Sequence, residues 1–228
     1  MSRSRPVVAI DGPAGVGKST TARMLARRLG IPYLDTGAMY RCLALGVLRQ
    51  GIDPEDRAAV EAGAAGTRLE LRMTDDGPEL LLDGTPVGAE IRSSEVSQAT
   101  STISTYPEVR RRMVELQRRF GERHGGVIEG RDIGSVVFPA TPHKFFLDAD
   151  PRVRAERRHR ELEARGERRE AREIAAELEE RDQRDRQRQD SPLVRCSDHV
   201  LIDTGELRPE QVVERIASAV CERERRTG

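Results

Sequence analysis

Apolar residues follow two different spacings, and the spacing alternates from one segment to the next. Short, nearly continuous apolar runs predict buried strands, whereas longer segments with apolar residues every three or four positions predict amphipathic helices. Core strands are expected at residues 7–11, 33–34, 126–129, 143–148 and 200–203. Because strands and helices alternate, we expect an α/β fold of three layers, in which helices flank a central parallel sheet of five strands.

Residues that favour helix ends delimit the expected helices. Helices are expected over residues 19–29, 38–49, 93–104, 107–123, from 151 to an interruption at 166, over 169–189 and from 209 onward. Gly30 and Gly51 follow the first two and favour their termination. Asp53, followed by Pro54 and Glu55, has the residue types of an N-cap and a first turn, so a further helix is expected to begin there.

One region departs from this alternation. Residues 69–73 alternate between apolar and polar, 74–78 form a turn cluster, and 79–83 contain the apolar run Leu80-Leu81-Leu82. This pattern predicts a β-hairpin, to which Val87 adds a third short strand. We therefore expect a small antiparallel insert at roughly residues 64–90.

Composition narrows the function classes. The 39 basic and 39 acidic residues balance, so nothing indicates the strongly basic surface of a nucleic-acid-binding domain. No apolar run is long enough to span a membrane, and residues 1–6 lack the apolar segment of a secretory signal. Cys42, Cys196 and Cys221 are scattered, without metal-ligand spacing, as free thiols in a reducing compartment would be. We expect a cytoplasmic protein, a monomer, with no membrane or nucleic-acid partner.

The first expected strand leads into Gly12-Pro13-Ala14-Gly15-Val16-Gly17-Lys18-Ser19, which fits the phosphate-binding loop pattern G-x-x-x-x-G-K-[ST]. Glycines let successive N–H groups point inward at phosphate oxygens, and the helix that follows adds the positive end of its dipole. We expect this loop and Thr20 to bind ATP, with Lys18 on the terminal phosphates and the Ser19 hydroxyl on Mg²⁺.

Lysine is rare in this chain, which makes the loop lysine conspicuous. Only Lys18 and Lys144 are lysines among the 39 basic residues. A compact ammonium fits between crowded phosphates better than a planar guanidinium does. The choice of Lys at this position therefore agrees with a triphosphate site.

The class of phosphate-loop protein depends on what else the chain carries. Neither lysine provides the Asn-Lys-x-Asp guanine reader of GTPases. The motor-like ATPases need a strand that ends in Asp-Glu, and the run at residues 145–148 is followed by Ala149 instead. The small size and the Arg-rich helices at residues 152–190 favour a small-molecule kinase, which must neutralise two polyanions and exclude water.

Three further segments carry a family resemblance. They are Asp35-Thr36-Gly37-Ala38-Met39-Tyr40-Arg41, Gly130-Arg131-Asp132-Ile133-Gly134-Ser135-Val136-Val137-Phe138-Pro139 and Glu180-Arg181-Asp182-Gln183-Arg184-Asp185-Arg186-Gln187-Arg188. Together with the loop and the hairpin insert, they resemble the bacterial cytidylate kinases, in order, over nearly the whole chain. The resemblance implies transfer of a phosphoryl group from ATP to CMP or dCMP. It also implies a single kinase domain, with a core at about residues 5–35, 126–150 and 195–225, an acceptor-binding region at 36–125 and a lid at 152–190.

The residue types at the matching positions suit an acceptor phosphate. Arg41 and Arg131 each follow the end of an expected strand, where α/β sheets bind ligands, and guanidinium groups suit phosphate. Arg181, Asp185 and Arg188 would share one helix face, which in isolation would predict only a ladder of ion pairs. The resemblance instead implies that they contact the sugar and phosphate of the acceptor, and that Lys18 and the arginines Arg131, Arg181 and Arg188 stabilise the transferred group.

A site that selects cytosine needs an acceptor near N4 and a donor near N3 or O2. Asp132 can accept, whereas Arg110 and Ser101 can donate, and the resemblance places these three with Thr36 around the base. The residues alone would not single out Ser101 in its Ser/Thr-rich helix, or Arg110 beside two further arginines. The resemblance completes the CMP-binding set: Thr36, Tyr40, Arg41, Ser101, Arg110, Arg131, Asp132, Arg181, Asp185 and Arg188.

Two alternatives stay open at this point. One is a kinase that accepts UMP as well as CMP, or another small acceptor. The other is a nucleotide-dependent protein whose Arg-rich helices contact RNA or a partner, which the balanced charge disfavours. Arg157 and its neighbours belong to the expected lid, where one arginine would stack on adenine.

Overall fold

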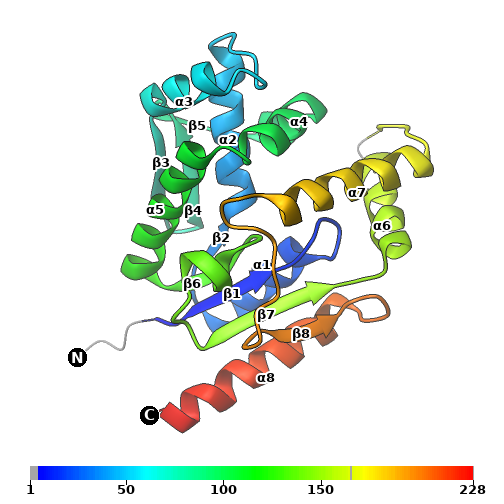
Figure 1. Ribbon diagram of the computed structural model, residues 1–228. Coiled ribbons are helices and arrows are strands. Elements are labelled where there is room, and N and C mark those ends of the chain that lie inside the picture. Colours follow the sequence, from blue (N-terminus) through cyan, green and yellow to red (C-terminus); the bar gives the residue numbers. More distant parts are fainter. Residues whose placement is uncertain (1–4, 165, 228) are drawn as a thin grey trace.

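Five parallel strands form the central sheet of the computed structural model, which describes residues 5–164 and 166–227 (Figure 1). The strands are β1 (Val7–Asp11), β2 (Tyr33–Asp35), β6 (Gly126–Glu129), β7 (His143–Asp148) and β8 (Val200–Asp203). Their order is β2-β6-β1-β7-β8, and each neighbouring pair is parallel. The α/β prediction with a five-stranded parallel sheet is confirmed.

Alternate residues of the strands pack on opposite faces of the sheet, which makes three layers. The helices that cover the two faces are α1 (Lys18–Leu29) and α8 (Pro209–Thr227) on one side, and α2 (Thr36–Arg49) and α5 (Pro107–His124) on the other. Val8 and Ile10 of β1 belong to the core beside α1 and α8, whereas Ala9 belongs to the core beside α2 and α5. All three are fully buried. The carboxyl ends of the strands are thereby held in one rigid edge.

The expected antiparallel insert is present as a separate three-stranded sheet. Its strands are β3 (Leu69–Thr74), β4 (Gly77–Leu82) and β5 (Thr85–Pro86), with α3 (Arg57–Gly66) before it and the 3₁₀ turn Ala89–Arg92 and α4 (Ser94–Ile103) after it. The third strand ends just before Val87, whose N–H still donates to the carbonyl of Leu80 at 3.1 Å. In Figure 1 this sheet and α2–α5 lie together above the central sheet.

The start predicted for the third helix is wrong by several residues. The Asp53 carboxylate accepts from the N–H of Glu55 at 3.0 Å, and its carbonyl accepts from Asp56 at 3.0 Å, so the segment is a turn. Asp56 is the N-cap instead, because its side chain accepts from the N–H of Ala59 at 3.1 Å. Two aspartates with the same capping ability lie three residues apart, and the helix uses the second.

Two helices rich in charges of both signs lie beyond the carboxyl ends of β1 and β7 (Figure 1). They are α6 (Pro151–Glu163), capped by Asp150, and α7 (Ala171–Gln187). The predicted helix over 169–189 is therefore shorter at both ends. Arg188 follows the end of α7 with an extended ψ of 138°, so it does not share a helix face with Asp185 as predicted. Its guanidinium nevertheless returns to that carboxylate, at 3.2 Å.

The phosphate loop joins β1 to α1 and lies directly against β7. Gly12 has a φ of +147°, and a Cβ there would lie 2.1 Å from the carbonyl oxygen of Leu147. Only glycine fits this position, because any side chain would overlap the backbone of the neighbouring strand. The loop is thus fixed at the centre of the sheet edge.

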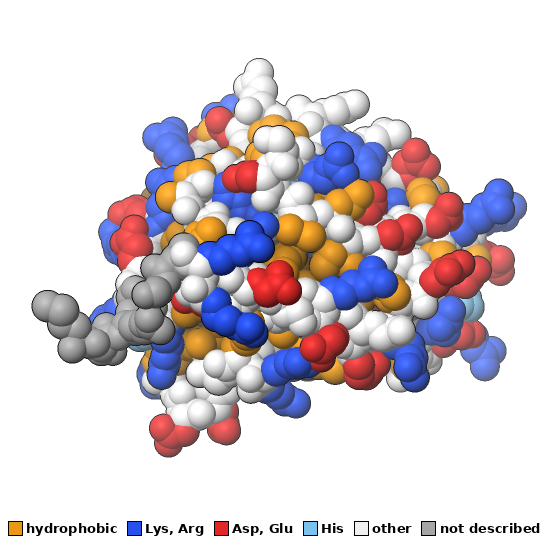
Figure 2. Space-filling view, turned by 90° about the horizontal axis from the view of Figure 1, so that it is seen from below, with side chains coloured by type: hydrophobic (Ala, Val, Ile, Leu, Met, Phe, Trp, Pro, Cys, Tyr) orange, Lys and Arg blue, Asp and Glu red, His pale blue; other side chains and the backbone are white. Residues whose placement is uncertain are grey.

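Charged side chains of both signs are mixed on the molecular surface. On the face shown in Figure 2, the coloured basic and acidic side chains are interspersed, and neither forms a continuous area. This agrees with the balanced composition. None of the helices in residues 5–164 and 166–227 combines the length and apolar character needed to cross a membrane.

Candidate active site

The phosphate loop borders a cavity of about 400 Å³ at the carboxyl end of the sheet. Of the loop residues expected to bind ATP, those that line it are Ala14, Gly15, Gly17, Lys18, Ser19 and Thr20. Gly12 and Pro13 lie behind this lining, and Val16 lines a neighbouring cavity. Lys18 is 6% exposed, and its ammonium donates to the carbonyl of Pro13 at 2.5 Å. It is therefore held over the loop that a polyphosphate would occupy.

Burial lowers the pKa of Lys18 from 10.5 to about 7. The positive charge of Arg131 acts in the same direction, Glu129 opposes it, and Arg181 lowers the pKa further. Crowding of cations around a buried ammonium disfavours its charged form until an anion arrives. The cavity is therefore electrostatically prepared for a polyanion.

Six arginines share this cavity with Lys18: Arg23, Arg41, Arg92, Arg131, Arg158 and Arg181. Arg41, Arg131 and Arg181 were predicted from the sequence as site residues, whereas the other three were not. Burial, followed by the charge of Arg131, lowers the pKa of Arg181 to about 10. Arg41 is held by Asp35, at 3.0 Å between Nη2 and Oδ2. The structure thus brings the predicted phosphate-binding arginines to one place.

Two carboxylates face the same cavity, at the ends of adjacent strands. Glu129 ends β6 and Asp35 ends β2, and both line the cavity with Ser19. Burial raises the pKa of Glu129, and the nearby charge of Asp35 adds to this, whereas Lys18 and hydrogen bonds from Tyr33 and Ser19 oppose it. Sequence reasoning missed Glu129. The signal that could have found it is a carboxylate at the last position of a buried strand, directly before a motif.

A second cavity adjoins the first and shares Gly37, Gly130, Arg131 and Arg181 with it. The other residues that line it are Thr36, Tyr40, Thr100, Ser104, Arg110, Asp132, Asp185 and Arg188. Most of the predicted acceptor residues therefore surround this space. Gly130, Arg131 and Arg181 lie between this space and the cavity that holds Lys18, because they line both.

The floor of this second cavity is a buried ion pair. Arg110 Nη2 lies 2.6 Å from Asp132 Oδ2, and the side chains are 3% and 7% exposed. Arg110 Nη1 also donates to the carbonyl of Ser104 at 3.1 Å, and its guanidinium lies 5.6 Å from the centre of the Tyr40 ring. Three separate contacts thus fix the direction of Arg110 and, through it, of Asp132.

Asp185 connects the arginines of the two cavities. Arg131 Nε donates to Asp185 Oδ2 at 2.8 Å, and Arg188 contacts Oδ1. Burial alone would raise the pKa of Asp185, but the charges of Arg131, Arg188 and Arg181 outweigh it and hold that pKa below its usual range. The carboxylate therefore stays ionised and orients the guanidinium groups around it.

Several buried donors around this space have no partner among the described residues. They are the Tyr40 hydroxyl, Nε of Arg41 and of Arg110, and Nε and Nη2 of Arg188. Buried polar groups in folded proteins are nearly always hydrogen-bonded, so a cluster of exceptions needs an explanation. Nearly all of them are N–H groups of cations. They suit a ligand rich in anionic and carbonyl oxygens.

Ser101, which the resemblance places around the base, is hydrogen-bonded to α7 in this structure. Its hydroxyl accepts a hydrogen bond from Arg184 of α7 at 2.7 Å, and Ser101 is not among the residues that line the second cavity. Thr100 and Ser104, which are four residues apart, line the cavity instead. Residues four apart share a helix face, whereas the intervening Ser101 is turned toward α7.

A third cavity, of about 440 Å³, lies on the other side of the phosphate loop and shares Gly15, Gly17 and Thr20 with the first. Its walls come from α6, including Arg157 and Arg160, and from the segment between β8 and α8. Arg157 donates to the carbonyl of Thr204 at 2.6 Å. The three cavities thus form a row, with Lys18 in the middle one.

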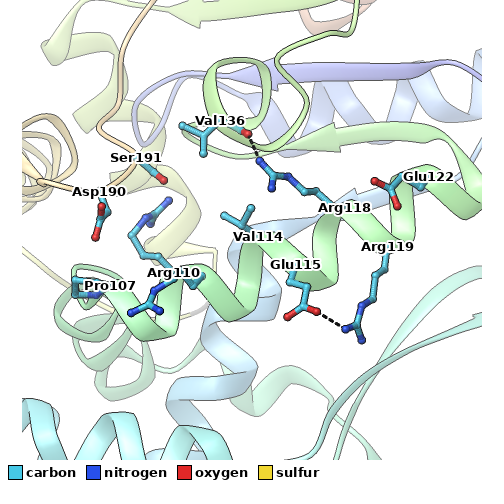
Figure 3. A pocket seen from close by; sticks show the side chains of 11 residues that line it. Pro107, Arg110, Val114, Glu115, Arg118, Arg119, Glu122, Val136, Asp190 and Ser191 are labelled. Carbon is cyan, nitrogen blue, oxygen red and sulfur yellow. Dashed lines mark hydrogen bonds and ion pairs between the residues drawn. The ribbon is translucent and has the colours of Figure 1, made fainter.

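A further cavity and a cluster of polar side chains lie outside this row. A cavity of about 490 Å³ runs along α5 between Val114, Val136 and Ser191, and it meets the row only at Arg110 (Figure 3). Elsewhere, Cys196, Asp198 and His199 each place a ligand atom within 4.8 Å of the others. Both ring nitrogens of His199 are engaged, however.

The His199 ring is held between a turn and a strand. Nδ1 accepts from the N–H of Cys196 at 3.1 Å, and Nε2 lies 3.4 Å from the carboxylate of Asp11. With Nδ1 as an acceptor, Nε2 carries the proton. No ring lone pair is left for a cation, so this histidine supports Asp11 rather than a metal.

Comparison with known proteins identifies the family. The family model for cytidylate kinase matches residues 8–222. The cytidylate kinase of Syntrophotalea carbinolica is 44% identical over 218 residues, which cover 96% of this chain and 93% of that protein. The cytidylate kinase of Rhodococcus jostii is 45% identical over 224 residues, covering 98% of both chains.

The chain belongs to the cytidylate kinase family. It is therefore a phosphotransferase, and the kinase family implies ATP as the phosphoryl donor. An uncharacterized protein from Eubacterium ventriosum superposes with a TM-score of 0.53 at 14% identity, over 96% of this chain and 99% of that one. That likeness concerns the fold alone. For a cytidylate kinase family member, the RNA-binding alternative is not favoured.

Proposed function

We propose that this chain transfers the γ-phosphoryl group of ATP to CMP or dCMP, giving ADP and CDP or dCDP. The observation that carries the proposal is the row of three cavities, in which the cation-lined space that holds Lys18 adjoins a second one at Arg131 and Arg181. A kinase must bring together two polyanions, and this is where their phosphates would meet.

The donor would occupy the first and third cavities. The triphosphate would lie over the loop N–H groups and Lys18, and the adenine would enter the space beside Arg157 and Arg160. Arg157 is the better candidate for stacking, because its contact with Thr204 fixes its guanidinium at the cavity wall.

The acceptor would occupy the second cavity. Asp132 would accept a hydrogen bond from the cytosine amino group, and Arg110 would donate toward N3 or O2. The buried ion pair between them fixes both directions, so a base with the reversed pattern would leave buried groups unpaired. Asp185 and Arg188 would contact the sugar, and Arg41, Arg131 and Arg181 the phosphate.

A hydroxyl and two carboxylates beside the loop suit Mg²⁺, which prefers oxygen ligands. Ser19, Asp35 and Glu129 line the same cavity, and Ser19 is hydrogen-bonded to Glu129. We propose that the Ser19 hydroxyl would hold the ion, with the two carboxylates around its water shell. When bound, Mg²⁺ would neutralise charge on the transferred group.

Catalysis by this chain would consist of positioning and charge stabilisation. Lys18 and the arginines surround the place where charge develops, in a site that α6 and α7 screen from water. The acceptor is already a phosphate oxygen, so no side chain is required as a general base. Asp132 would determine specificity, and Arg131, Arg181 and Arg188 would stabilise the transferred group.

This assignment gives different segments of the chain different roles. The sheet and the phosphate loop form the core, residues 36–125 bind the acceptor, and residues 152–190 act as the lid. We propose a monomer as the functional unit.

The assay that tests the proposal measures ADP release with ATP and Mg²⁺ across CMP, dCMP, UMP and AMP. We expect kcat/KM for CMP and dCMP well above that for UMP, because UMP cannot pair with Asp132 and Arg110. Equal use of UMP would favour the broader UMP/CMP kinase instead. No ADP release with any monophosphate would overturn the proposed reaction.

A further inference from the structure

Asp182 is a buried carboxylate on a helix whose other charges are mostly exposed. It is 2% exposed, and each of its oxygens has a partner from a different part of the chain. Oδ1 accepts from the N–H of Ala14, in the phosphate loop, at 3.3 Å. Oδ2 accepts from the guanidinium of Arg154, on α6. One side chain of α7 therefore contacts both the loop and the second charged helix.

Arg154, on α6, contacts both Asp182 and the same loop residue, Ala14. It is 5% exposed, and its Nη1 also donates to the carbonyl of Ala14 at 3.3 Å. Its Nε donates to the carbonyl of Ala149 at 3.2 Å, which fixes the guanidinium to the end of β7. The N–H of Ala14 is thus held by α7 and its C=O by α6. Ala14 lines the phosphate cavity, but its N–H is not turned toward it.

The phosphate loop, α6 and α7 are also in apolar contact with one another. The methyl group of Ala14 belongs to a small core with Ala155 and Leu162 of α6 and with Ile174 and Leu178 of α7. At the next loop residue, Gly15, an added Cβ would lie 3.1 Å from the Cβ and the carbonyl oxygen of Arg154. The loop, α6 and α7 are therefore packed together as closely as side chains allow.

Two arginines that line the phosphate cavity are close in sequence to Arg154 and Asp182. Arg158 lies one helical turn after Arg154, and Arg181 directly precedes Asp182, and both line the cavity with Lys18. Burying an ion pair is a poor way to gain stability, because apolar residues of similar size often serve as well. A role in placing other residues accounts for the pair better.

We propose that Asp182 and Arg154 are positioning residues, which lock α6 and α7 onto Ala14 so that Arg158 and Arg181 face the phosphates bound at Lys18. This inference rests on the proposed function, because it assigns the pair to the same reaction. Neither side chain would touch a substrate. A displacement of about 1 Å in such a site can lower turnover by about 100-fold.

The test separates positioning from packing with three variants. Asp182→Asn keeps an acceptor for the Ala14 N–H but removes the charge opposite Arg154. The double variant Asp182→Leu/Arg154→Met replaces the pair with apolar side chains. Glu156→Gln, which removes an exposed ion pair with Arg160 on α6, is the matched control. Each is measured for kcat, KM for ATP, ATP Kd by titration calorimetry, and Tm.

We expect Asp182→Asn to lower kcat/KM for ATP by about tenfold or more and to weaken ATP binding, with Glu156→Gln within about twofold of the unmodified chain. We expect the double variant to regain the Tm of the unmodified chain but not its kcat/KM. Recovery of both would overturn the inference, as would normal kinetics and ATP binding in Asp182→Asn. If the unmodified chain binds ATP but phosphorylates no monophosphate, the proposed reaction fails, and the ATP Kd values alone decide the inference.

Discussion

ATP binding should be accompanied by proton uptake at Lys18. Burial lowers the pKa of this ammonium to about 7, so much of it is neutral in the free protein above that pH. A triphosphate placed over the loop supplies the missing negative charge. The charged form then becomes the favoured one, and a proton must be taken from the solvent.

The size of the effect follows from the charges. The attraction between one phosphate charge and the Lys18 ammonium at about 4 Å, at an effective dielectric constant of about 20, contributes about 4 kcal/mol. This energy corresponds to a rise of about three pKa units. The pKa of Lys18 would therefore rise from about 7 to about 10 on binding. At pH 8 this corresponds to uptake of about 0.9 proton, and at pH 6 to about 0.1. Since protonation favours binding, ATP affinity should fall as pH rises above 7, by up to about tenfold per pH unit.

The assay is titration calorimetry of ATP at pH 8 without Mg²⁺, in buffers of different ionisation enthalpy. At that pH the phosphates of ATP are already ionised, so the uptake belongs to the protein. Lys18→Arg is the control, because its guanidinium is permanently charged and should show almost no uptake. An uptake at pH 8 that is below about 0.2 proton, or equal in the unmodified chain and Lys18→Arg, would refute the reasoning.

Three further predictions concern single residues. Lys18→Ala should lower kcat by about 100-fold or more with an unchanged circular dichroism spectrum, and near-normal turnover would remove the loop from the mechanism. Asp132→Ala should raise KM for CMP by about tenfold or more and leave KM for ATP within about twofold, because a base-reading acceptor is lost; equal losses for both nucleotides would contradict the assignment. Gly121→Ala should destabilise the fold by about 1–3 kcal/mol, seen as a lower Tm, since its Cβ would lie 2.3 Å from the Phe138 ring; an unchanged Tm would mean that the ring moves freely.

Most of the fold follows from signals that are local in the sequence. The apolar runs at Gly126–Glu129 and His143–Asp148 match the strands residue for residue. Pairs of turn residues and capping residues located the hairpin and most helix ends. Helix ends were predicted wrongly where two neighbouring residues could both act as the N-cap. Asp53 and Asp56 both can cap a helix, and the sequence contains no signal that ranks them.

The site was less accessible to sequence reasoning, because side-chain direction depends on packing. The motif segments located Lys18, Arg131 and Asp132 near one another. They did not reveal that Ser101 faces α7, since that depends on how α4 is rotated against its neighbours. Asp182 was part of a quoted motif, but its partner Arg154 is 28 residues away on another helix. A contact between two helices cannot be predicted from the spacing of apolar and polar residues within either helix.

Asp11, the last residue of β1, links the phosphate loop to the segment after β6. Its buried carboxylate accepts from the N–H groups of Ile133 at 2.8 Å and Gly134 at 2.7 Å, with His199 behind it. Asp11 immediately precedes the phosphate loop, and Ile133 immediately follows Asp132, the residue proposed to contact the base. Two hydrogen bonds in the core of the protein thus link the phosphate loop directly to the segment that carries Asp132. This link does not run through α6, α7 or residues 36–125, so substitutions in those segments would leave it unchanged.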